Sequence, residues 1–293
     1  MKDYVVRGTD KGGNFRFFAS ASKDIVQTAS DHHHTSPVVT AALGRTMTAA
    51  AMMAQMLKND NDRMSVTIKG DGPIGGVIVE ANTKGDIKAY PYNANVDLPL
   101  NEKGKLDVSG AFGNAVMTIM KDMGLKEPYI GQTILVSGEI AEDFTYYFAT
   151  SEQTPSAVAL GVLIDVDHSI KQSGGFIIQV MPDASDDAID LLEEKLNDFP
   201  SVTTLLEEGK TVEEIIEELL GEVTFWERKE IQFSCDCSLD QMERGLISIG
   251  EEDLTEILEE DRGAELTCHF CNKKYNFNED DLQGLLDEVK NNK

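Results

Sequence analysis

Four cysteines are the residues of this chain whose types and spacing most clearly predict chemistry. They are the only cysteines among 293 residues, and they form a C-x-C pair, Cys235 and Cys237, and a C-x-x-C pair, Cys268 and Cys271. Sulfur is a soft ligand, and two such pairs joined by a loop can close tetrahedrally around one zinc ion. We therefore predict a zinc site with these four ligands, one ion per chain. An iron–sulfur cluster fits less well, because the spacing matches neither ferredoxin pattern.

The C-x-C pair differs from the C-x-x-C knuckles that are usual in structural zinc sites. It holds its sulfurs close together and makes a cramped disulfide ring, and strained, exposed disulfides are typical of labile, regulatory bonds. Zinc also keeps its cysteines as thiolates, which is the form that peroxides attack. The spacing alone leaves two alternatives open, an oxidant sensor and an inert structural zinc site.

The segment that contains the cysteines, residues 231–293, is predicted to be a small separate module. It has only four aromatic residues, Phe233, Phe270, Tyr275 and Phe277. A module this small with so few large apolar side chains does not fold easily without a disulfide or a bound metal. We expect a bound metal to stabilise it.

Two other functions for paired cysteines are disfavoured. A thioredoxin-like oxidoreductase places its C-x-x-C between a strand and a helix of a βαβ unit and needs no further cysteine ligands. A zinc finger that binds nucleic acid needs a basic surface, whereas residues 235–293 contain 16 acidic and 6 basic residues.

Three further motifs do not carry chemistry. Gly70–Gly75 fits G-x-G-x-x-G, but Gly76–Val79 follows as a strand-like run, so we predict a tight turn between strands. His32–His34 lacks a second cluster of ligands, and we expect a solvated loop there. His269 lies inside the second cysteine pair, but four cysteines already saturate zinc. With no Ser/His/Asp set and no P-loop, we predict no catalytic residues and no enzyme.

Residues 1–180 are predicted to form an α+β domain with a largely antiparallel sheet and packed helices. Ser36-Pro37 is a helix start, and the helix is expected to run to about Lys58. Val5–Arg7 and Phe15–Ala19 flank a glycine-rich turn and predict a hairpin. Further strands are predicted at Met64–Lys69, Val77–Ala81, Asp86–Tyr90, Val116–Met120, Thr133–Ser137, Val158–Ile164 and Phe176–Met181.

Residues 181–230 are predicted to be an acidic helical linker. From Asp183 to Glu222 there are 14 acidic residues and 2 lysines. Apolar residues recur there at helical spacing, and Thr211 with Glu214 forms a capping box before the second apolar stripe. Each helix has one apolar and one acidic face, which predicts docked surface helices weakened by like-charge repulsion.

The overall charge restricts the partners. With 26 basic and 52 acidic residues the net charge is −26, which repels phosphate backbones and anionic lipid, so we expect neither nucleic acid nor membrane as a partner. The first residues contain no apolar signal segment, and Pro37–Leu57 is too polar to span a bilayer. We expect a cytoplasmic protein, in a compartment that keeps thiols reduced.

Several segments along the chain carry motifs that occur together in one family. They are Ala41–Thr46, Gly70–Gly75, Ser137–Asp143, Ser151–Val158, Gly174–Gln179 and the two cysteine pairs. In these segments the chain closely resembles the redox-regulated heat-shock chaperones, the thirty-three-kilodalton chaperonin family. The resemblance runs from end to end.

The resemblance implies an ATP-independent holdase of the stress response. Reduced protein would hold zinc on Cys235, Cys237, Cys268 and Cys271 and be inactive. Oxidation would join Cys235 with Cys237 and Cys268 with Cys271, release zinc, unfold the C-terminal module and free the linker. The active form would be a homodimer that binds unfolded or oxidatively damaged client proteins. The linker is unusually acidic for the family.

Two rival functions remain at this point. One is a constitutive zinc-stabilised protein that binds a single fixed partner, and the other is a thiol oxidoreductase. The strain of the C-x-C ring favours the redox-activated chaperone over the first rival. The missing thioredoxin context counts against the second.

Overall fold

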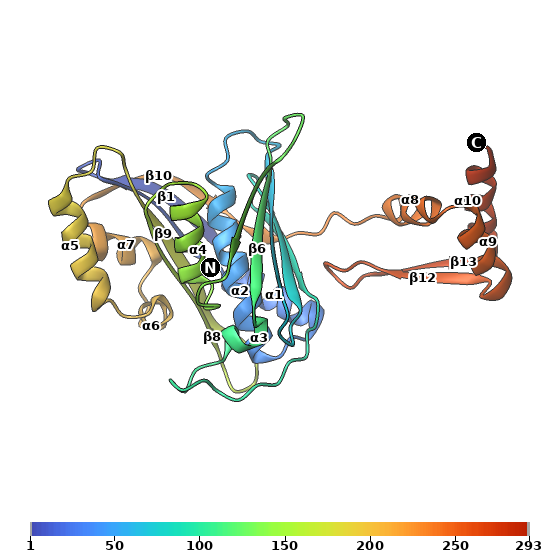
Figure 1. Cartoon of the computed structure of the whole chain (residues 1–293), viewed down its shortest axis with the longest axis horizontal. Helices are drawn as coiled ribbons and strands as arrows, with labels where there is room; N and C mark the ends of the chain where they lie inside the picture. Colours follow the sequence, from blue (N-terminus) through green and yellow to red (C-terminus); the bar gives the residue numbers. More distant parts are fainter. Residues whose placement is uncertain (1, 292–293) are drawn as a thin grey trace. The chain divides into compact units, whose positions relative to one another are not determined.

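A computed structural model of the protein describes residues 2–291 and divides the chain into two compact units. The first unit ends at Ser234 and the second begins at Cys235 (Figure 1). The first unit contains two mostly antiparallel sheets with packed helices, so the predicted α+β class is confirmed. The acidic segment 181–230 belongs to the first unit. The division of the chain into three functional parts stays a prediction.

One sheet of the first unit has five antiparallel strands. In spatial order they are β10 (Val223–Glu230), β1 (Tyr4–Asp10), β2 (Phe15–Ala21), β9 (Ile170–Val180) and β8 (Ser156–Ile164). The predicted hairpin is confirmed as β1 and β2, whose register pairs Tyr4 with Ala21. The edge strand β10 was not predicted.

The other sheet has six strands. In spatial order they are β11 (Gln232–Phe233), β5 (Asp86–Pro91), β4 (Gly76–Asn82), β3 (Arg63–Gly70), β6 (Ala115–Asp122) and β7 (Tyr129–Ile134). All neighbours are antiparallel except β11 and β5. The predicted turn at Gly70–Gly75 is confirmed, because it joins β3 to β4 and Gly70 donates its N–H to the Gly75 carbonyl at 3.0 Å.

A nearly fully buried helix, α2 (Pro37–Ala54), packs against both sheets (Figure 1). It begins at Pro37 after Ser36, as predicted, and 16 of its residues are buried. It ends earlier than expected because the chain tightens into i→i+3 turns, the last of which joins Leu57 N–H to the Ala54 carbonyl at 3.2 Å. The other helices between strands are α1 (Lys23–His33), α3 (Val108–Phe112) and α4 (Ala141–Thr150).

Three helices of the acidic segment cover the opposite face of the five-stranded sheet. They are α5 (Asp186–Asn197), α6 (Val202–Glu207) and α7 (Val212–Leu220). The capping box is confirmed at the start of α7, where Glu214 N–H donates to Thr211 Oγ1 at 3.3 Å and Thr211 N–H to Glu214 Oε2 at 2.7 Å. Eight apolar side chains from these helices are buried against the sheet: Leu192, Val202, Leu205, Leu206, Val212, Ile215, Ile216 and Leu219. The predicted docked apolar stripe is therefore confirmed.

The prediction that His32–His34 form a solvated loop is wrong. His32 and His33 are the last two residues of α1, and His34 is its C-cap with a φ of 51°. The His32 ring packs at 5.1 Å from the ring of Phe233, and His33 Nε2 lies 3.1 Å from the carbonyl oxygen of Ala89. His32 and His33 are thus helix-end residues packed against neighbouring strands, whereas His34 is exposed.

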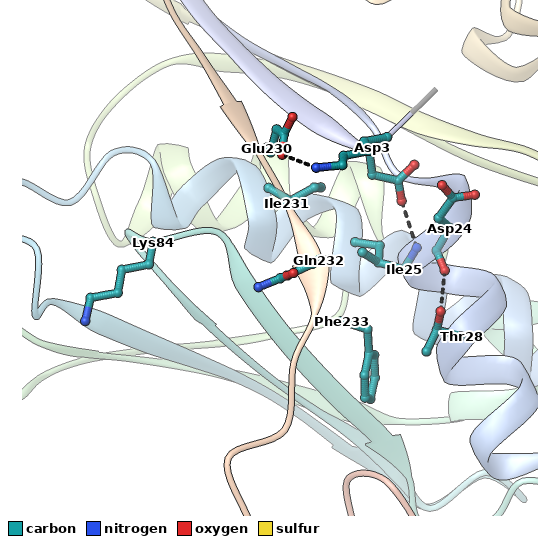
Figure 2. A pocket seen from close by; sticks show the side chains of 10 residues that line it. Asp3, Asp24, Ile25, Thr28, Lys84, Glu230, Ile231, Gln232 and Phe233 are labelled. Atoms are coloured by element: carbon teal, nitrogen blue, oxygen red, sulfur yellow. Dashed lines mark hydrogen bonds and ion pairs between the residues drawn. The ribbon is translucent and has the colours of Figure 1, made fainter.

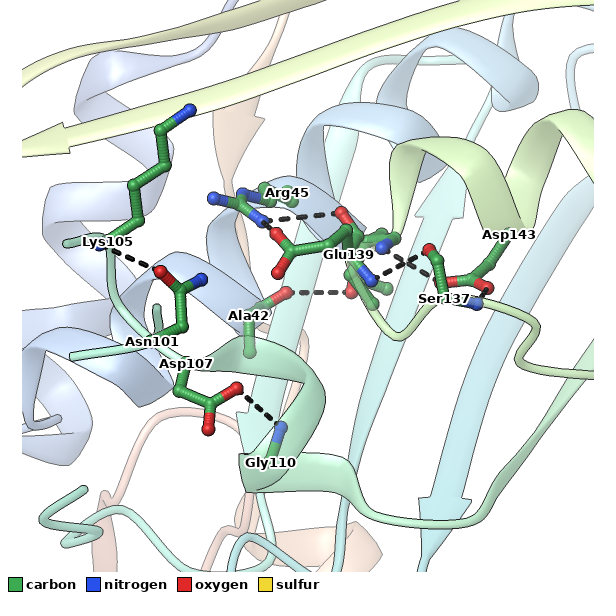
Figure 3. Close-up of polar contacts among 11 residues, drawn as sticks. Ala42, Arg45, Asn101, Lys105, Asp107, Gly110, Ser137, Glu139 and Asp143 are labelled. Atoms are coloured by element: carbon green, nitrogen blue, oxygen red, sulfur yellow. Dashed lines mark hydrogen bonds and ion pairs between the residues drawn. The ribbon is translucent and has the colours of Figure 1, made fainter. Parts of the chain in front are cut away.

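Strand β7 lies several residues before the predicted span 133–137. The reason is Asp143, which is fully buried and accepts hydrogen bonds from the N–H groups of Val136 and Ser137 at 2.7 and 2.8 Å (Figure 3). Those two donors are thereby removed from the sheet ladder. Asp143 also accepts from Ile140 N–H at 2.9 Å, and Ile140 has a φ of 71°, which is strained for a β-branched residue.

We predict that Asp143→Ala lowers the free energy of unfolding by about 2–4 kcal/mol, because three backbone donors lose their acceptor. The control is Asp107→Ala, since the half-buried Asp107 caps only Gly110 N–H, at 2.8 Å (Figure 3). Its expected cost is about 1 kcal/mol. Chemical denaturation of both variants measures the difference, and equal costs contradict the role of Asp143.

The second unit is built from three helices and one hairpin. They are α8 (Leu239–Ile249), α9 (Glu251–Glu260), β12 (Gly263–Thr267), β13 (Lys274–Asn278) and α10 (Glu279–Asn291). Its apolar cluster contains only seven buried residues: Leu246, Leu254, Tyr275, Phe277, Leu282, Leu285 and Leu286. The core of this unit is therefore small. Among residues 2–291, no helix combines the length and apolar content needed to cross a bilayer.

Candidate metal centre and its connection to the first unit

The four cysteine sulfurs converge on one point of the second unit. Their Sγ atoms all lie within 4.8 Å of one another, and all four thiols are free. The Sγ atoms of Cys235 and Cys268 are 3.6 Å apart, and those of Cys237 and Cys271 are 3.5 Å apart. Four sulfurs bound tetrahedrally at about 2.3 Å from one zinc ion are separated by about 3.8 Å. The structure thus brings all four predicted ligands together at a separation that fits one ion.

The first pair is positioned by the start of α8. Ser238 is the N-cap of this helix, and its Oγ accepts a hydrogen bond from Gln241 N–H at 3.3 Å. In return Gln241 Oε1 accepts from Ser238 N–H at 3.1 Å. This capping box fixes the direction of the chain immediately after Cys237.

The second pair lies in the turn between β12 and β13. Cys268 N–H donates to the Lys273 carbonyl at 2.9 Å, and Asn272 N–H donates to the Cys268 carbonyl at 2.8 Å. Asn272 has a φ of 56°, a left-handed conformation that asparagine tolerates. The turn therefore presents Cys268 and Cys271 on the same side as the first pair.

Burial and hydrogen bonding act differently on the individual thiols. Burial raises the pKa of Cys235 and of Cys271. Burial also raises the pKa of Cys237, but hydrogen bonds from Tyr275 and from the other cysteines outweigh it, so the net shift is downward. The Tyr275 hydroxyl lies 3.0 Å from the Cys237 carbonyl and 3.2 Å from Cys237 Sγ, and this contact raises the pKa of Tyr275 to about 12.

These properties fit a bound cation with a preference for sulfur. Cys268 is buried and the other three thiols are half-buried, so all four can ionise together only if a positive charge offsets their repulsion and their loss of hydration. Among the described residues, this is also the single group of three or more cysteine, histidine or acidic side chains close enough to share an ion. The predicted metal site therefore has a suitable set of donor atoms. His32–His34 are not part of any such group among the described residues.

The chain enters this centre from a segment that is fixed to the first unit. Gln232 N–H donates to the Gly85 carbonyl and Ser234 N–H donates to the Ile87 carbonyl, each at 2.9 Å. Ile231 is buried in the core of the first unit. A Cβ on Gly85 would lie 2.2 Å from the Glu230 carbonyl oxygen, so only glycine permits this close approach. The anchor, residues 230–234, ends one residue before Cys235.

A buried carboxylate supports the anchor from the other side. Asp3 accepts a hydrogen bond from Ile25 N–H at 2.7 Å, and its carbonyl accepts from Ile231 N–H at 3.0 Å (Figure 2). Burial raises the pKa of Asp3 to about 6, although the backbone donors oppose the shift. Asp3 therefore links the first strand, α1 and the anchor. A single aspartate near the start of the chain gave no sequence signal of this role.

The comparisons with known proteins decide the family. A family model described as Hsp33 protein matches residues 3–278. The chain belongs to the Hsp33 family. A 33 kDa chaperonin of Ruminiclostridium cellulolyticum is 52% identical over 98% of this chain and 99% of its own length. One from Agathobacter rectalis is 50% identical over 97% of this chain and 100% of its own.

A solved structure of the Hsp33 family supports the same fold. The crystal structure of a 33 kDa chaperonin from Thermotoga maritima is 34% identical to this chain, with a TM-score of 0.94. The alignment covers 99% of this chain and 100% of the other. The family resemblance predicted from the sequence motifs is thus confirmed.

We predict that Tyr275→Phe weakens metal binding by about tenfold, because hydrogen bonds to a ligand typically change affinity by that order. The substitution keeps the buried ring and removes only the hydroxyl that contacts Cys237. Zinc competition with a chromophoric chelator measures the affinity. Tyr129→Phe, which removes a hydroxyl from β7 of the first unit, is the control. Equal affinity of the two variants contradicts a role for Tyr275.

Proposed function

We propose that this Hsp33-family chain is a redox-regulated, ATP-independent holdase that is inactive with zinc bound and is activated by oxidation. The observation that carries the proposal is the convergence of four free thiols in a unit with a small core. Cys235, Cys237, Cys268 and Cys271 hold the ion. The protein has no catalytic residues and acts by binding.

Zinc binding supplies much of the folding energy of the second unit. In small zinc modules the metal contributes on the order of 10 kcal/mol. The seven-residue apolar cluster of this unit contributes only a few kcal/mol after conformational entropy is subtracted. Loss of the ion therefore unfolds the unit.

Oxidation forms two local disulfides, Cys235 with Cys237 and Cys268 with Cys271. In the folded unit, sulfur contacts of 3.6 and 3.5 Å join other partners, Cys235 with Cys268 and Cys237 with Cys271. Once the first bond releases zinc and the unit loosens, however, sequence proximity decides the pairing. A cross-link between the two motifs closes a loop of more than thirty residues, which costs a few kcal/mol of chain entropy.

The linker helices are the second element of the switch. Their apolar side chains cover Phe15, Phe17, Phe176 and Ile178 on the five-stranded sheet. Two lysines of the linker hold the end of α7, because Lys195 donates to the Leu219 carbonyl at 2.7 Å and Lys210 contacts Glu218 at 2.5 Å. Detachment of these helices uncovers apolar surface on the sheet and on the helices themselves, and this surface binds clients.

The partners follow from the same surface. Clients are unfolded or oxidatively damaged proteins, and the active chain is a homodimer. The net charge of −26 keeps such complexes soluble and disfavours nucleic acid and membrane as partners. We propose a cytoplasmic location and a role in the stress response, where reduced thiols are the resting state.

We predict one zinc ion per reduced chain and none in the Cys268→Ser/Cys271→Ser variant, because two remaining sulfurs cannot close a tetrahedral site. Metal analysis after treatment with a thiol-reactive mercurial measures the released zinc. A Ser248→Ala/Thr255→Ala variant, which removes two hydroxyls that donate to carbonyls within α8 and α9 of the same unit, serves as the control. Unchanged stoichiometry in the cysteine variant contradicts the site.

We predict that peroxide-treated full chain suppresses aggregation of a thermally unfolding client, whereas zinc-loaded reduced chain does not. A chain that ends at Ser234 lacks the switch and should be partly active even when reduced, with no response to peroxide. Light scattering measures aggregation, and peptide mapping of the oxidised sample identifies the disulfides.

A dominant link between Cys235 and Cys268, or between Cys237 and Cys271, contradicts the proposed pairing. If the oxidised full chain and the shortened chain both fail to suppress aggregation, the holdase proposal is wrong. A constitutive protein with one fixed partner then takes its place.

A further inference from the structure

Strand β7 forms an open edge of the six-stranded sheet. It pairs with β6 along one side, and no other strand among the described residues pairs with its outer side. Its residues Ile130 and Ile134 are each 60% exposed. An edge strand presents unpaired N–H and C=O groups that can pair with another extended chain.

Apolar side chains of the neighbouring strand extend this edge inward. The register places Met120 of β6 opposite Ile130, and Val116 opposite Ile134. None of these four side chains is buried. They lie on the face of the sheet that points away from α2, because they alternate with the buried residues of both strands. Together they form an apolar strip beside an open backbone edge.

The surroundings of the strip are electrically neutral in a strongly acidic protein. Strand β7 has no charged residue, whereas the whole chain has a net charge of −26. Its sheet face carries three basic and three acidic side chains, Arg63, Lys69, Lys88, Glu80, Asp86 and Asp122. Their charges sum to zero. A segment of either sign can therefore approach without strong repulsion.

Strand β10, an edge strand of the five-stranded sheet, is protected against pairing with another chain in a way that β7 is not. Strand β10 carries four consecutive charged residues, Glu227–Glu230, and its pairing with β1 shifts register beside Gly8. Charges and bulges of this kind prevent edge-to-edge pairing. Strand β8 is also uncharged, but all of its residues are half-buried. β7 is the edge on which exposed apolar side chains and an unprotected backbone coincide.

We propose that β7 accepts an extended, apolar segment of an unfolded protein as an added strand. The inference rests on the proposed holdase function and gives it a second client surface. This surface is exposed in the zinc-bound state, but it binds one short segment and holds a client against aggregation only together with the uncovered linker surface. Backbone pairing is independent of sequence, which suits a binder of many clients, and the apolar strip favours segments with alternating apolar residues. A second copy of this chain is a poorer occupant, because it would bring a further charge of −26.

The test uses reduced, zinc-loaded full chain and a fluorescent ten-residue peptide of alternating valine and threonine with no net charge. Fluorescence anisotropy measures the affinity. Ile130→Lys/Ile134→Lys should weaken binding by about tenfold or more, because two apolar contacts are replaced by charges. The matched control is Leu125→Lys/Val166→Lys, which adds the same charge at side chains that are 67% and 97% exposed. It should leave the affinity unchanged.

Hydrogen exchange locates the bound peptide and distinguishes binding at β7 from binding elsewhere on the protein. Peptide should slow amide exchange in residues 129–134 of the original chain, and zinc content should be equal in all variants. The proposal is overturned if no peptide binds, if both double variants bind equally, or if the protected amides lie elsewhere. It is also overturned if Ile130→Lys/Ile134→Lys changes only self-association in sedimentation. Because the protein stays reduced, these outcomes are independent of whether oxidation activates the chain.

Discussion

Four thiols that lie within 4.8 Å of one another repel as they ionise, and burial adds to the cost of each negative charge. The second unit surrounds them with 16 acidic and 6 basic residues, so its own charges give no relief. Only a bound cation makes the ionised set favourable. The hairpin turn with Cys268, the capped start of α8 and the small apolar cluster are all arranged around this requirement. In the proposed switch, the folding of the unit is therefore coupled to a ligand that an oxidant can displace.

In the linker helices, repulsion between like charges opposes the burial of apolar side chains. Like charges four residues apart, such as Glu213 with Glu217 and Glu214 with Glu218, each oppose the helix by a few tenths of a kcal/mol. Each buried valine, leucine or isoleucine contributes about 1.5–3 kcal/mol. With eight such apolar side chains buried, docking outweighs repulsion while the sheet is available. Because of the repulsion on their acidic faces, these helices nevertheless have little stability of their own when they are not docked.

Local signals predicted a large part of this architecture. The capping box of Thr211 and Glu214 and the Ser36-Pro37 helix start are found at those residues, because both rest on contacts within one turn of helix. The grouping of the four cysteines was likewise visible, since cysteine has few roles other than metal binding at that spacing. Strand β10 was missed because Thr224–Glu230 contains four charged residues and is extended only through its pairing with β1.

The remaining differences also come from distant contacts. The end of β7 depends on Asp143, which accepts hydrogen bonds from the N–H groups of Val136 and Ser137. The strand propensity of the apolar run 134–136 gives no sign of these bonds. Helix α1 and its terminal histidines were missed although Ile25, Val26 and Ala29 have helical spacing, because three consecutive polar histidines carry no apolar periodicity that extends the helix to its end. Asp3 and Gly85 could not be identified at all, since their partners are residues 230–231, far along the chain.

Under the proposed switch mechanism, the anchor at β11 also determines how the protein recovers once an oxidative episode has passed. Ser234 is held to β5, so an unfolded second unit remains tethered to a folded body by its first residue. All four proposed ligands lie on one continuous stretch of 37 residues, from Cys235 to Cys271. Recapture of an ion after re-reduction is then first order in protein. A dilute population resets as fast as a concentrated one, which a switch assembled from two separate chains does not achieve.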